Sequence, residues 1–373
     1  NEINYQWVKS IRSSALIVWT FLSAGIILGG YWAYQELGWG GYWAWDPVEN
    51  SSLMPWFLLT AFIHSSIIQE KRGLLKTWNV LLASLTYIFV ILGTFITRSG
   101  IISSVHSFTA ESLGPLFFVF LCTLILLTVF WFFKHYHMLV SEEKIKSFTS
   151  REGGFLYNNL ILVTMCFIVL WGTLFPIISE AWNGEKIHIG QNYFNQLNVP
   201  IGIFLLFLMG IGPLLSWKKT SSSTLISNFK IPMISSFITG SLYMVFTDEF
   251  RFYPFVTLLG IIFTLTAISI EFKKSFDSHY SKDSSFFRAI LNLLSQNRHK
   301  NGGYIVHIGI TLLFVGFVGR AFEKETEFVL KPDEQFYFAN YNFRLNSVTT
   351  EQRNNHLAAI SNMDVTDESN NYI

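Results

Sequence analysis

The sequence is poor in charged side chains. Only 14% of its 373 residues are Asp, Glu, Lys or Arg, whereas 51% are apolar. A soluble domain of this composition would leave large apolar patches in water, so the chain is expected in a lipid bilayer. The net charge of +1 gives no whole-molecule reason to expect nucleic acid as a partner.

Cysteine is also scarce. The two cysteines, Cys122 and Cys166, each stand inside an apolar run, and neither belongs to a Cys-x-x-Cys pair. This excludes a thiol-exchange role for the chain itself. The sequence has no Cys-x-x-Cys-His motif either, so this stretch is not predicted to be a c-type cytochrome itself.

Long apolar runs dominate instead. A helix of about 20 apolar residues crosses the ~30 Å of hydrocarbon in a bilayer. Runs of this kind lie near residues 14–35, 52–70, 77–97, 115–135, 157–178, 199–217, 231–246, 253–271 and 303–322. The fold class predicted is therefore an all-α polytopic membrane protein with about nine transmembrane helices.

Basic residues predict the orientation of these helices. Lys and Arg gather in the N-terminal segment and in alternate loops, whereas the other loops between runs hold only Arg98, Lys186 and Arg251. Because cytoplasmic loops carry the excess of Lys and Arg, the N-terminal segment is predicted to lie inside. The segment at 38–56 and the C-terminal tail are then outside.

The tail differs in character from the rest. Tyr341, Phe343 and Leu345 alternate with polar residues, which is typical of a half-buried strand. We predict a helical bundle over 1–322 and the start of an extracytoplasmic β-rich domain over 323–373. No cleavable signal pattern follows Asn1, and the last residues break off in the strand-like region, so both ends look cut.

The outer loop at 38–56 is crowded with aromatic side chains: Trp39, Tyr42, Trp43, Trp45 and Trp56. One interpretation is an interfacial belt, where Trp and Tyr commonly gather. A belt does not need Gly40 and Gly41, nor the Asp46-Pro47 and Glu49-Asn50 pairs, which suggest a loop held in one shape. Rigid aromatic planes with glycines for close approach suit a flat macrocycle. Asp46 and Glu49 either cap the following helix or orient a substrate, and capping is favoured for Glu49.

Two histidines stand inside predicted spans. An ionisable residue there is costly and is a functional candidate by default. At a rise of ~1.5 Å per residue, His64 and His307 lie at similar depths from the inner surface. They form a plausible axial pair for a b-type haem, and Gly309 would admit the ring edge. The alternative is two unrelated polar contacts inside a bundle.

His106 follows the third span, on the same predicted side as the aromatic loop. That shared side is required if it is to bind a haem resting on the tryptophans. The other six histidines have interfacial or loop positions that need no ligand role: His135, His137, His188, His279, His299 and His356.

Several segments together resemble one family. The loop resembles the tryptophan-rich WWD motif of haem-handling proteins, and its continuation Asp-Pro-Val-Glu-Asn-Ser-Ser-Leu-Met-Pro-Trp resembles CcmF rather than CcmC or CcsA. Similar segments of that family match Gly93–Gly100, Ser104–Phe108, Ser150–Glu152 with Asn158-Asn159, and Gly172–Pro176 with Glu180. Tyr42 replaces a tryptophan that the family often has. The family's additional spans and an outer-loop histidine would precede Asn1.

The resemblance implies a haem lyase that forms carbon–sulfur bonds. Haem from the chaperone CcmE would rest on the loop, positioned by Trp39, Trp43, Trp45 and Asp46 with His106 as an axial ligand. It would be attached to the Cys-x-x-Cys-His segment of apocytochrome c, with CcmH/CcmI-type subunits as further partners. His64 and His307 would hold a haem b that keeps the delivered iron reduced, with quinol as an electron source. The membrane would be the bacterial plasma membrane facing the periplasm, or else the mitochondrial inner membrane.

Other functions are compatible with parts of the sequence. A haem transporter would need a polar route through the bundle, for which the spans offer little beyond the two histidines. A b-type, quinol-linked electron carrier explains His64 and His307 but gives no role to the aromatic loop or His106. A purely structural role in assembly would explain neither the pair His64 and His307 nor the aromatic loop with His106. A specialised lyase of the nitrite-reductase type fits as well as a general one.

Overall fold

The structure is a computed structural model that describes residues 5–36, 41–102, 104, 106, 113–140, 147–247, 249–283, 298–324, 326, 328–353, 356–369 and 372–373. Contacts divide the chain into two compact units, Asn1–Val318 and Gly319–Ile373. Each unit is described by itself below.

Long apolar helices make up the first unit. Within the described residues, nine of them are long and apolar enough to cross a membrane. The long helices are α1 (Tyr5–Glu36), α2 (Pro47–Arg72), α3 (Lys76–Ser99), α4 (Leu113–Lys134), α6 (Arg151–Asn183), α7 (Gln191–Leu214), α8 (Ser222–Phe246), α9 (Phe252–Asp283) and α11 (Arg298–Arg320). The predicted polytopic helical fold is confirmed. Several helices run past the predicted apolar runs because their polar ends can project beyond the hydrocarbon.

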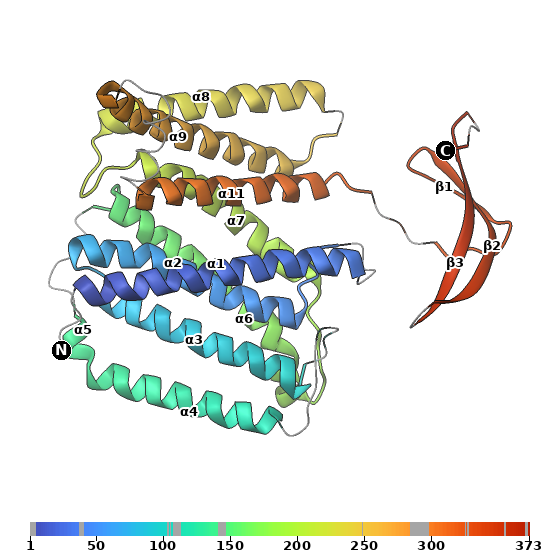
Figure 1. Ribbon diagram of the computed structural model, residues 1–373, viewed down its shortest axis with the longest axis horizontal. Coiled ribbons are helices and arrows are strands. Elements are labelled where there is room, and N and C mark those ends of the chain that lie inside the picture. Colours follow the sequence, from blue (N-terminus) through green and yellow to red (C-terminus); the bar gives the residue numbers. More distant parts are fainter. Residues whose placement is uncertain are drawn as a thin grey trace. The chain divides into compact units, whose positions relative to one another are not determined.

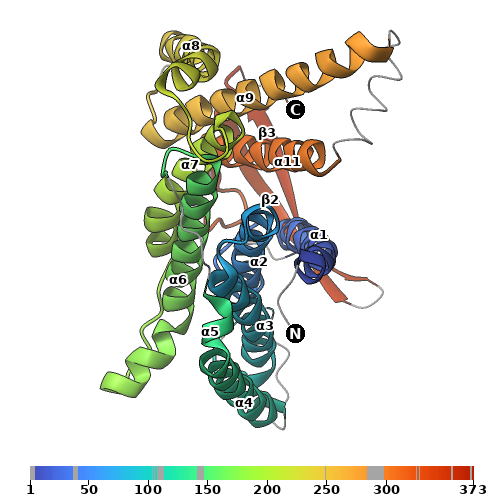
Figure 2. The ribbon, with the colours of Figure 1, turned by 90° about the vertical axis from the view of Figure 1, so that its left-hand side faces the viewer.

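The helices run side by side, with α4 at one edge and α8 at the other (Figures 1 and 2). A short helix that the sequence did not predict, α5 (Tyr136–Leu139), follows α4. It packs beside the start of α3, where Thr77 Oγ1 donates to the carbonyl of Leu139 at 2.8 Å.

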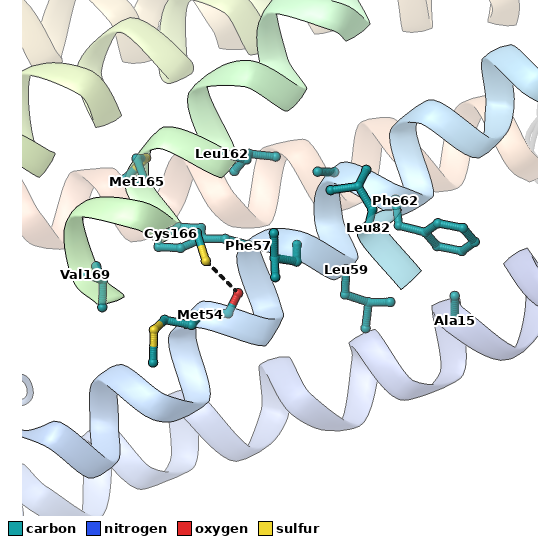
Figure 3. Close-up of a cluster of buried hydrophobic side chains, with 12 residues drawn as sticks. Ala15, Met54, Phe57, Leu59, Phe62, Leu82, Leu162, Met165, Cys166 and Val169 are labelled. Carbon is teal, nitrogen blue, oxygen red and sulfur yellow. Dashed lines mark hydrogen bonds between the residues drawn. The ribbon is translucent and has the colours of Figure 1, made fainter. Parts of the chain in front are cut away.

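The central helix is α2, which packs along α1, α3 and α6. Of its apolar stretch, 61% is buried, more than in any other span of the described chain. Met54 on α2 and Val169 on α6 are fully buried in the cluster between them, and the Cys166 thiol faces the carbonyl of Met54 at 3.6 Å (Figure 3). Small and polar residues line this helix contact too, as expected where helices approach closely in a membrane.

A second group is formed by α7, α8 and α9 around Leu214, Phe263 and Ala267. Here α7 and α9 approach closely at Gly210, where a Cβ atom would stand 2.9 Å from Cα of Thr264. Gly210 therefore fixes the distance between the two helices.

In contrast, α11 is held mainly by single side chains. Only 11% of its apolar stretch is buried. Phe314 lies at 3.9 Å from the Cβ position of Gly202 on α7, Tyr304 meets Phe272 on α9, and Phe317 stacks on Tyr42. These contacts join α11 to α7, to α9 and to the aromatic loop.

The second unit is a small antiparallel sheet in the order β1 (Gln335–Phe338), β2 (Tyr341–Arg353) and β3 (His356–Asp367). The predicted strand residues Tyr341, Phe343 and Leu345 all lie in β2. Leu345 is buried, and Phe343 stacks on Phe336 of β1 with ring centroids 4.8 Å apart. The alternation seen in the sequence thus marks a real strand.

Candidate functional site

The aromatic loop ends in a helix cap. Asp46 is the N-cap of α2, and its Oδ2 accepts from the backbone N–H of Val48 at 3.0 Å. Glu49 reaches back, so that its Oε2 accepts from the N–H groups of Ala44 and Asp46 at 3.0 and 3.1 Å. This capping box satisfies backbone donors that the helix leaves open. The capping role expected of Glu49 is confirmed. The capping box also fixes the backbone where the aromatic loop enters α2.

Trp45 anchors the loop to the bundle. Its indole Nε1 donates to Oδ1 of Asn195 at 2.8 Å, and its ring stacks on Phe194 with centroids 5.0 Å apart and planes inclined by 9°. The Trp45 backbone has φ +58°, a left-handed conformation that is uncommon for a bulky residue. Its carbonyl is held by the side-chain amide of Asn50 at 2.9 Å. Trp45 therefore has one ring face already occupied by protein.

The other loop aromatics have different surroundings. Trp43 meets the edge of Trp45 at 6.0 Å with perpendicular planes, and Tyr42 stacks on Phe317 of α11. Both are half-buried. Trp39, which was also predicted to position haem, lies outside the described residues. Trp43 thus has a perpendicular contact with Trp45, whereas Trp45 itself is stacked on Phe194.

His106 is brought to the same point as Asp46. Its Nδ1 lies 3.2 Å from Oδ2 of Asp46, although the two residues are 60 positions apart. Ser104 joins them, since its Oγ donates to the same Oδ2 at 2.6 Å and accepts from the backbone N–H of His106 at 3.0 Å. Both side chains are largely shielded, with 18% and 9% of the His106 and Asp46 side chains exposed.

This arrangement orients the imidazole. A histidine that donates Nδ1–H to a carboxylate has its lone pair on Nε2, which is thereby more basic, the arrangement found at metal-ligating histidines. The ring of Trp32, near the end of α1, lies 5.8 Å from that of His106. The geometry therefore gives His106 the form that an axial ligand of haem iron requires.

The second group lies in the C-terminal half of α2. The rings of His64 and His307 have centroids 6.3 Å apart with planes inclined by 55°. Two imidazoles that face one iron from opposite sides, with metal–nitrogen bonds of about 2 Å, have ring centroids about 6 Å apart. The sequence predicted similar depths for these histidines, and the structure makes them neighbours.

Three observations test whether a haem fits here. Nδ1 of His307 is buried and has no hydrogen-bond partner within the described residues. Gly309, which was expected to admit the edge of the ring, is exposed and lies two residues along α11, on a different face of the helix from His307. Phe155 on α6 stacks beside His64 with ring centroids 5.7 Å apart. The spacing of the two imidazoles and the aromatic ring beside His64 fit a planar bis-histidine group.

A bare metal ion fits less well. Within the described part of the chain, no group of three or more His, Cys, Asp or Glu side chains gathers as it would around a naked cation. A porphyrin supplies four nitrogen ligands of its own, so a pair of histidines is sufficient for haem.

Arg151 joins two helices. Its guanidinium donates to the backbone carbonyls of Leu215 and Pro213 at 3.1 and 2.8 Å, which connects the start of α6 to the end of α7. These bonds give Arg151 a structural role.

Sequence reasoning did not assign a role to several of these residues. Ser104 and Asn158 were noted only for family resemblance, while Trp32, Phe194 and Asn195 were not singled out. Each of them acts through a partner on another element, and a single sequence carries no signal of such pairing. Ser104 alone could have been suspected, because a hydroxyl two residues before a histidine can cap its backbone N–H.

Comparison with known proteins identifies relatives of this chain. Residues 2–103 match the family model of the cytochrome C assembly proteins. The chain is 34% identical over 349 residues to the cytochrome c-type biogenesis protein CycK of Rhizobium meliloti, which covers 93% of this chain and 51% of CycK. It is 32% identical over 376 residues to NrfE of Haemophilus influenzae, covering 100% of this chain and 56% of NrfE.

A solved structure also matches. The structure named cytochrome c heme lyase CcmF superposes with a TM-score of 0.76 at 26% identity, over 98% of this chain and 55% of that one. The chain thus spans about half the length of the relatives that it resembles.

Proposed function

Because this chain belongs to the CcmF/CycK family of cytochrome c-type biogenesis proteins, we propose that it contributes the haem-positioning part of a haem lyase. The contact between Asp46 and His106 carries the proposal. Two loops far apart in sequence place an oriented imidazole, backed by a carboxylate, beside an aromatic loop.

The substrates are a delivered haem and an apocytochrome c segment with the sequence Cys-x-x-Cys-His. His106 would bind the iron of the delivered haem through Nε2, and Trp43 would lie along the macrocycle. The same role is predicted from the sequence for Trp39, which lies outside the described residues. Trp45 keeps the loop in place through Phe194 and Asn195. The haem is received from the chaperone CcmE, and CcmH/CcmI-type subunits present the apocytochrome.

The bond-forming step needs little chemistry from this chain. Each apocytochrome thiol adds across one vinyl group of the haem, so that sulfur bonds to one vinyl carbon and hydrogen to the other, with no net oxidation. The contribution of the protein is to hold the reacting groups together and to exclude water, which can lower a barrier by several kcal/mol.

His64 and His307 would hold a haem b between α2 and α11. When bound, that group supplies the electron that keeps the delivered iron reduced, with quinol as its source. The chain's own residues fix the imidazole planes, since Phe155 and Asn158 of α6 contact His64 from one side. The outer face of the membrane is the side of the aromatic loop.

The test is covalent haem attachment to a c-type reporter cytochrome, measured by haem staining of denaturing gels from cells that make the full protein. His106→Ala is expected to reduce attached haem at least 10-fold, because the axial ligand is lost. His188→Ala is the matched control, since His188 is an exposed histidine of another loop. Attachment at the wild-type level in His106→Ala would contradict the lyase proposal and favour the electron carrier.

A further inference from the structure

A side-chain contact joins Asn158 on α6 to His64 on α2. The side-chain amide nitrogen Nδ2 of Asn158 on α6 lies 2.9 Å from Nδ1 of His64 on α2, 94 residues away. Asn158 is half-buried, in a span where a polar side chain is costly unless it has a partner.

The two asparagines of the Asn158-Asn159 pair have different partners. Asn159 is fully buried, and its amide lies between the carbonyl of Ala61 at 3.1 Å and the indole nitrogen of Trp78 at 3.2 Å. It therefore joins α6 to α2 and α3. Asn158 points instead to His64, together with Phe155 one turn earlier on the same helix face.

The contact decides which nitrogen of His64 carries a proton. A neutral imidazole has one N–H and one lone pair. When the amide donates to Nδ1, the proton sits on Nε2, and that nitrogen cannot bind iron. When the amide turns and its oxygen accepts from Nδ1–H, Nε2 is free to coordinate. A rotation of one amide thus separates a ligand form of His64 from a non-ligand form.

The two histidines are unequal in this respect. Nδ1 of His307 has no hydrogen-bond partner among the described residues. An acceptor on Nδ1–H makes a ligating histidine more basic. Of the two histidines, only His64 then has a described neighbour, Asn158, that can accept a hydrogen bond from Nδ1–H. That hydrogen bond would make the imidazole of His64 a stronger electron-pair donor to the iron.

We propose that Asn158 is a positioning residue that selects the ligand tautomer of His64 and tunes its donation to the intramembrane haem b. This rests on the proposed function, in which His64 and His307 hold that haem. A better donor stabilises ferric iron more than ferrous iron, so the hydrogen bond to Asn158 lowers the midpoint potential. A change at Asn158 should therefore move the potential in a direction set by its acceptor strength.

The experiment is a spectroscopic redox titration of the full protein, purified in detergent with its haem. Asn158→Leu removes the acceptor and should raise the midpoint potential and weaken haem retention about 10-fold to 100-fold. Asn158→Asp supplies a stronger acceptor and should lower the potential. Asn158→Gln keeps an amide and should fall nearer the wild type than Asn158→Leu, which preserves the test if the charged variant does not accumulate.

Asn159→Ala is the matched control, because its partners are Ala61 and Trp78. It should reduce thermal stability and leave the potential unchanged. If the midpoint potential rises in Asn158→Leu and falls in Asn158→Asp, the two opposite shifts cannot come from a general loosening of the bundle. Wild-type potentials in all Asn158 variants would overturn the positioning role while leaving haem b in place. If His64→Ala keeps the complete wild-type spectrum, the haem b part of the proposed function fails instead.

Discussion

A single carboxylate oxygen of Asp46 both caps a helix and contacts the candidate ligand His106. Oδ2 accepts from the N–H of Val48, which caps α2, and also contacts Nδ1 of His106 and Oγ of Ser104. The sequence offered capping and substrate orientation as alternatives for this residue. The structure shows a cap and a contact to the candidate ligand at the same time.

These two tasks can be separated by substitution. Asp46→Asn is expected to keep the cap, because Asn and Asp cap helices about equally well. It removes the charge behind His106, so delivered haem should bind about 10-fold to 100-fold more weakly. Asp46→Ala should in addition lose about 1 kcal/mol of stability. Haem titration by absorbance and thermal unfolding in detergent measure the two effects.

Ser150→Ala provides the control for the cap alone. Ser150 caps α6 through the N–H of Gly153 at 3.1 Å, away from His106. This variant should lose about 1 kcal/mol as well and bind haem normally. Unchanged haem binding by Asp46→Asn would show that the contact with His106 is only structural.

At the scale of single residues, the sequence predicted candidates better than partners. Hydropathy placed His64 and His307 at similar depths, but depth does not reveal which helices are neighbours. Trp45 was expected to support haem directly, whereas its contacts with Phe194 and Asn195 involve positions about 150 residues away. Long-range pairs of this kind leave no periodic trace in one sequence.

At the scale of elements, the helices were predictable and their spacing was not. A long apolar run suffices to identify a transmembrane helix. The packing distance depends instead on single small residues, such as Gly210 where α7 meets α9. The short helix α5 and the polar extensions of α1 and α9 escaped prediction, because neither contributes to an apolar run.

Two glycines of α7 offer a direct test of helix spacing. A Cβ atom at Gly210 would lie 2.8 Å from Oγ1 of Thr264 and 2.9 Å from its Cα, whereas one at Gly212 would meet nothing within 4 Å. Gly210→Ala should therefore cost about 1–3 kcal/mol through overpacking. Gly212→Ala should stabilise by about 0.5–1 kcal/mol, since alanine favours the helix.

Thermal unfolding of the purified protein in detergent compares these two variants. The Gly210→Ala substitution also disturbs the hydrogen bond that Thr264 Oγ1 donates to the carbonyl of Leu206 at 2.8 Å. Equal unfolding temperatures for both variants would mean that α7 and α9 can separate at little cost.

At the scale of the whole molecule, the polytopic fold follows from composition and the orientation remains a prediction. The distribution of Lys and Arg places the loop around Lys186 outside and the loop around Lys219 inside. Glu185 and Lys219 are both exposed in the structure, so each is accessible to a labelling reagent.

Single-cysteine variants test this orientation. After Cys122 and Cys166 are replaced by Ala, Glu185→Cys should react with a membrane-impermeant maleimide in intact cells. Lys219→Cys should react only after the membrane is permeabilised, because its loop is predicted to lie inside. The opposite labelling pattern would place the aromatic loop and His106 on the wrong side for receiving haem from outside.

One helix carries residues of both candidate sites. Asp46 caps the N-terminal end of α2, and His64 lies on the same helix. The eighteen positions between residues 46 and 64 correspond to about 27 Å at 1.5 Å per residue. Because α2 is the most deeply buried span of the described chain, it would hold the two proposed haem sites at a fixed separation. Inserting residues into this helix would change the separation and, with each added residue, rotate one site away from the other.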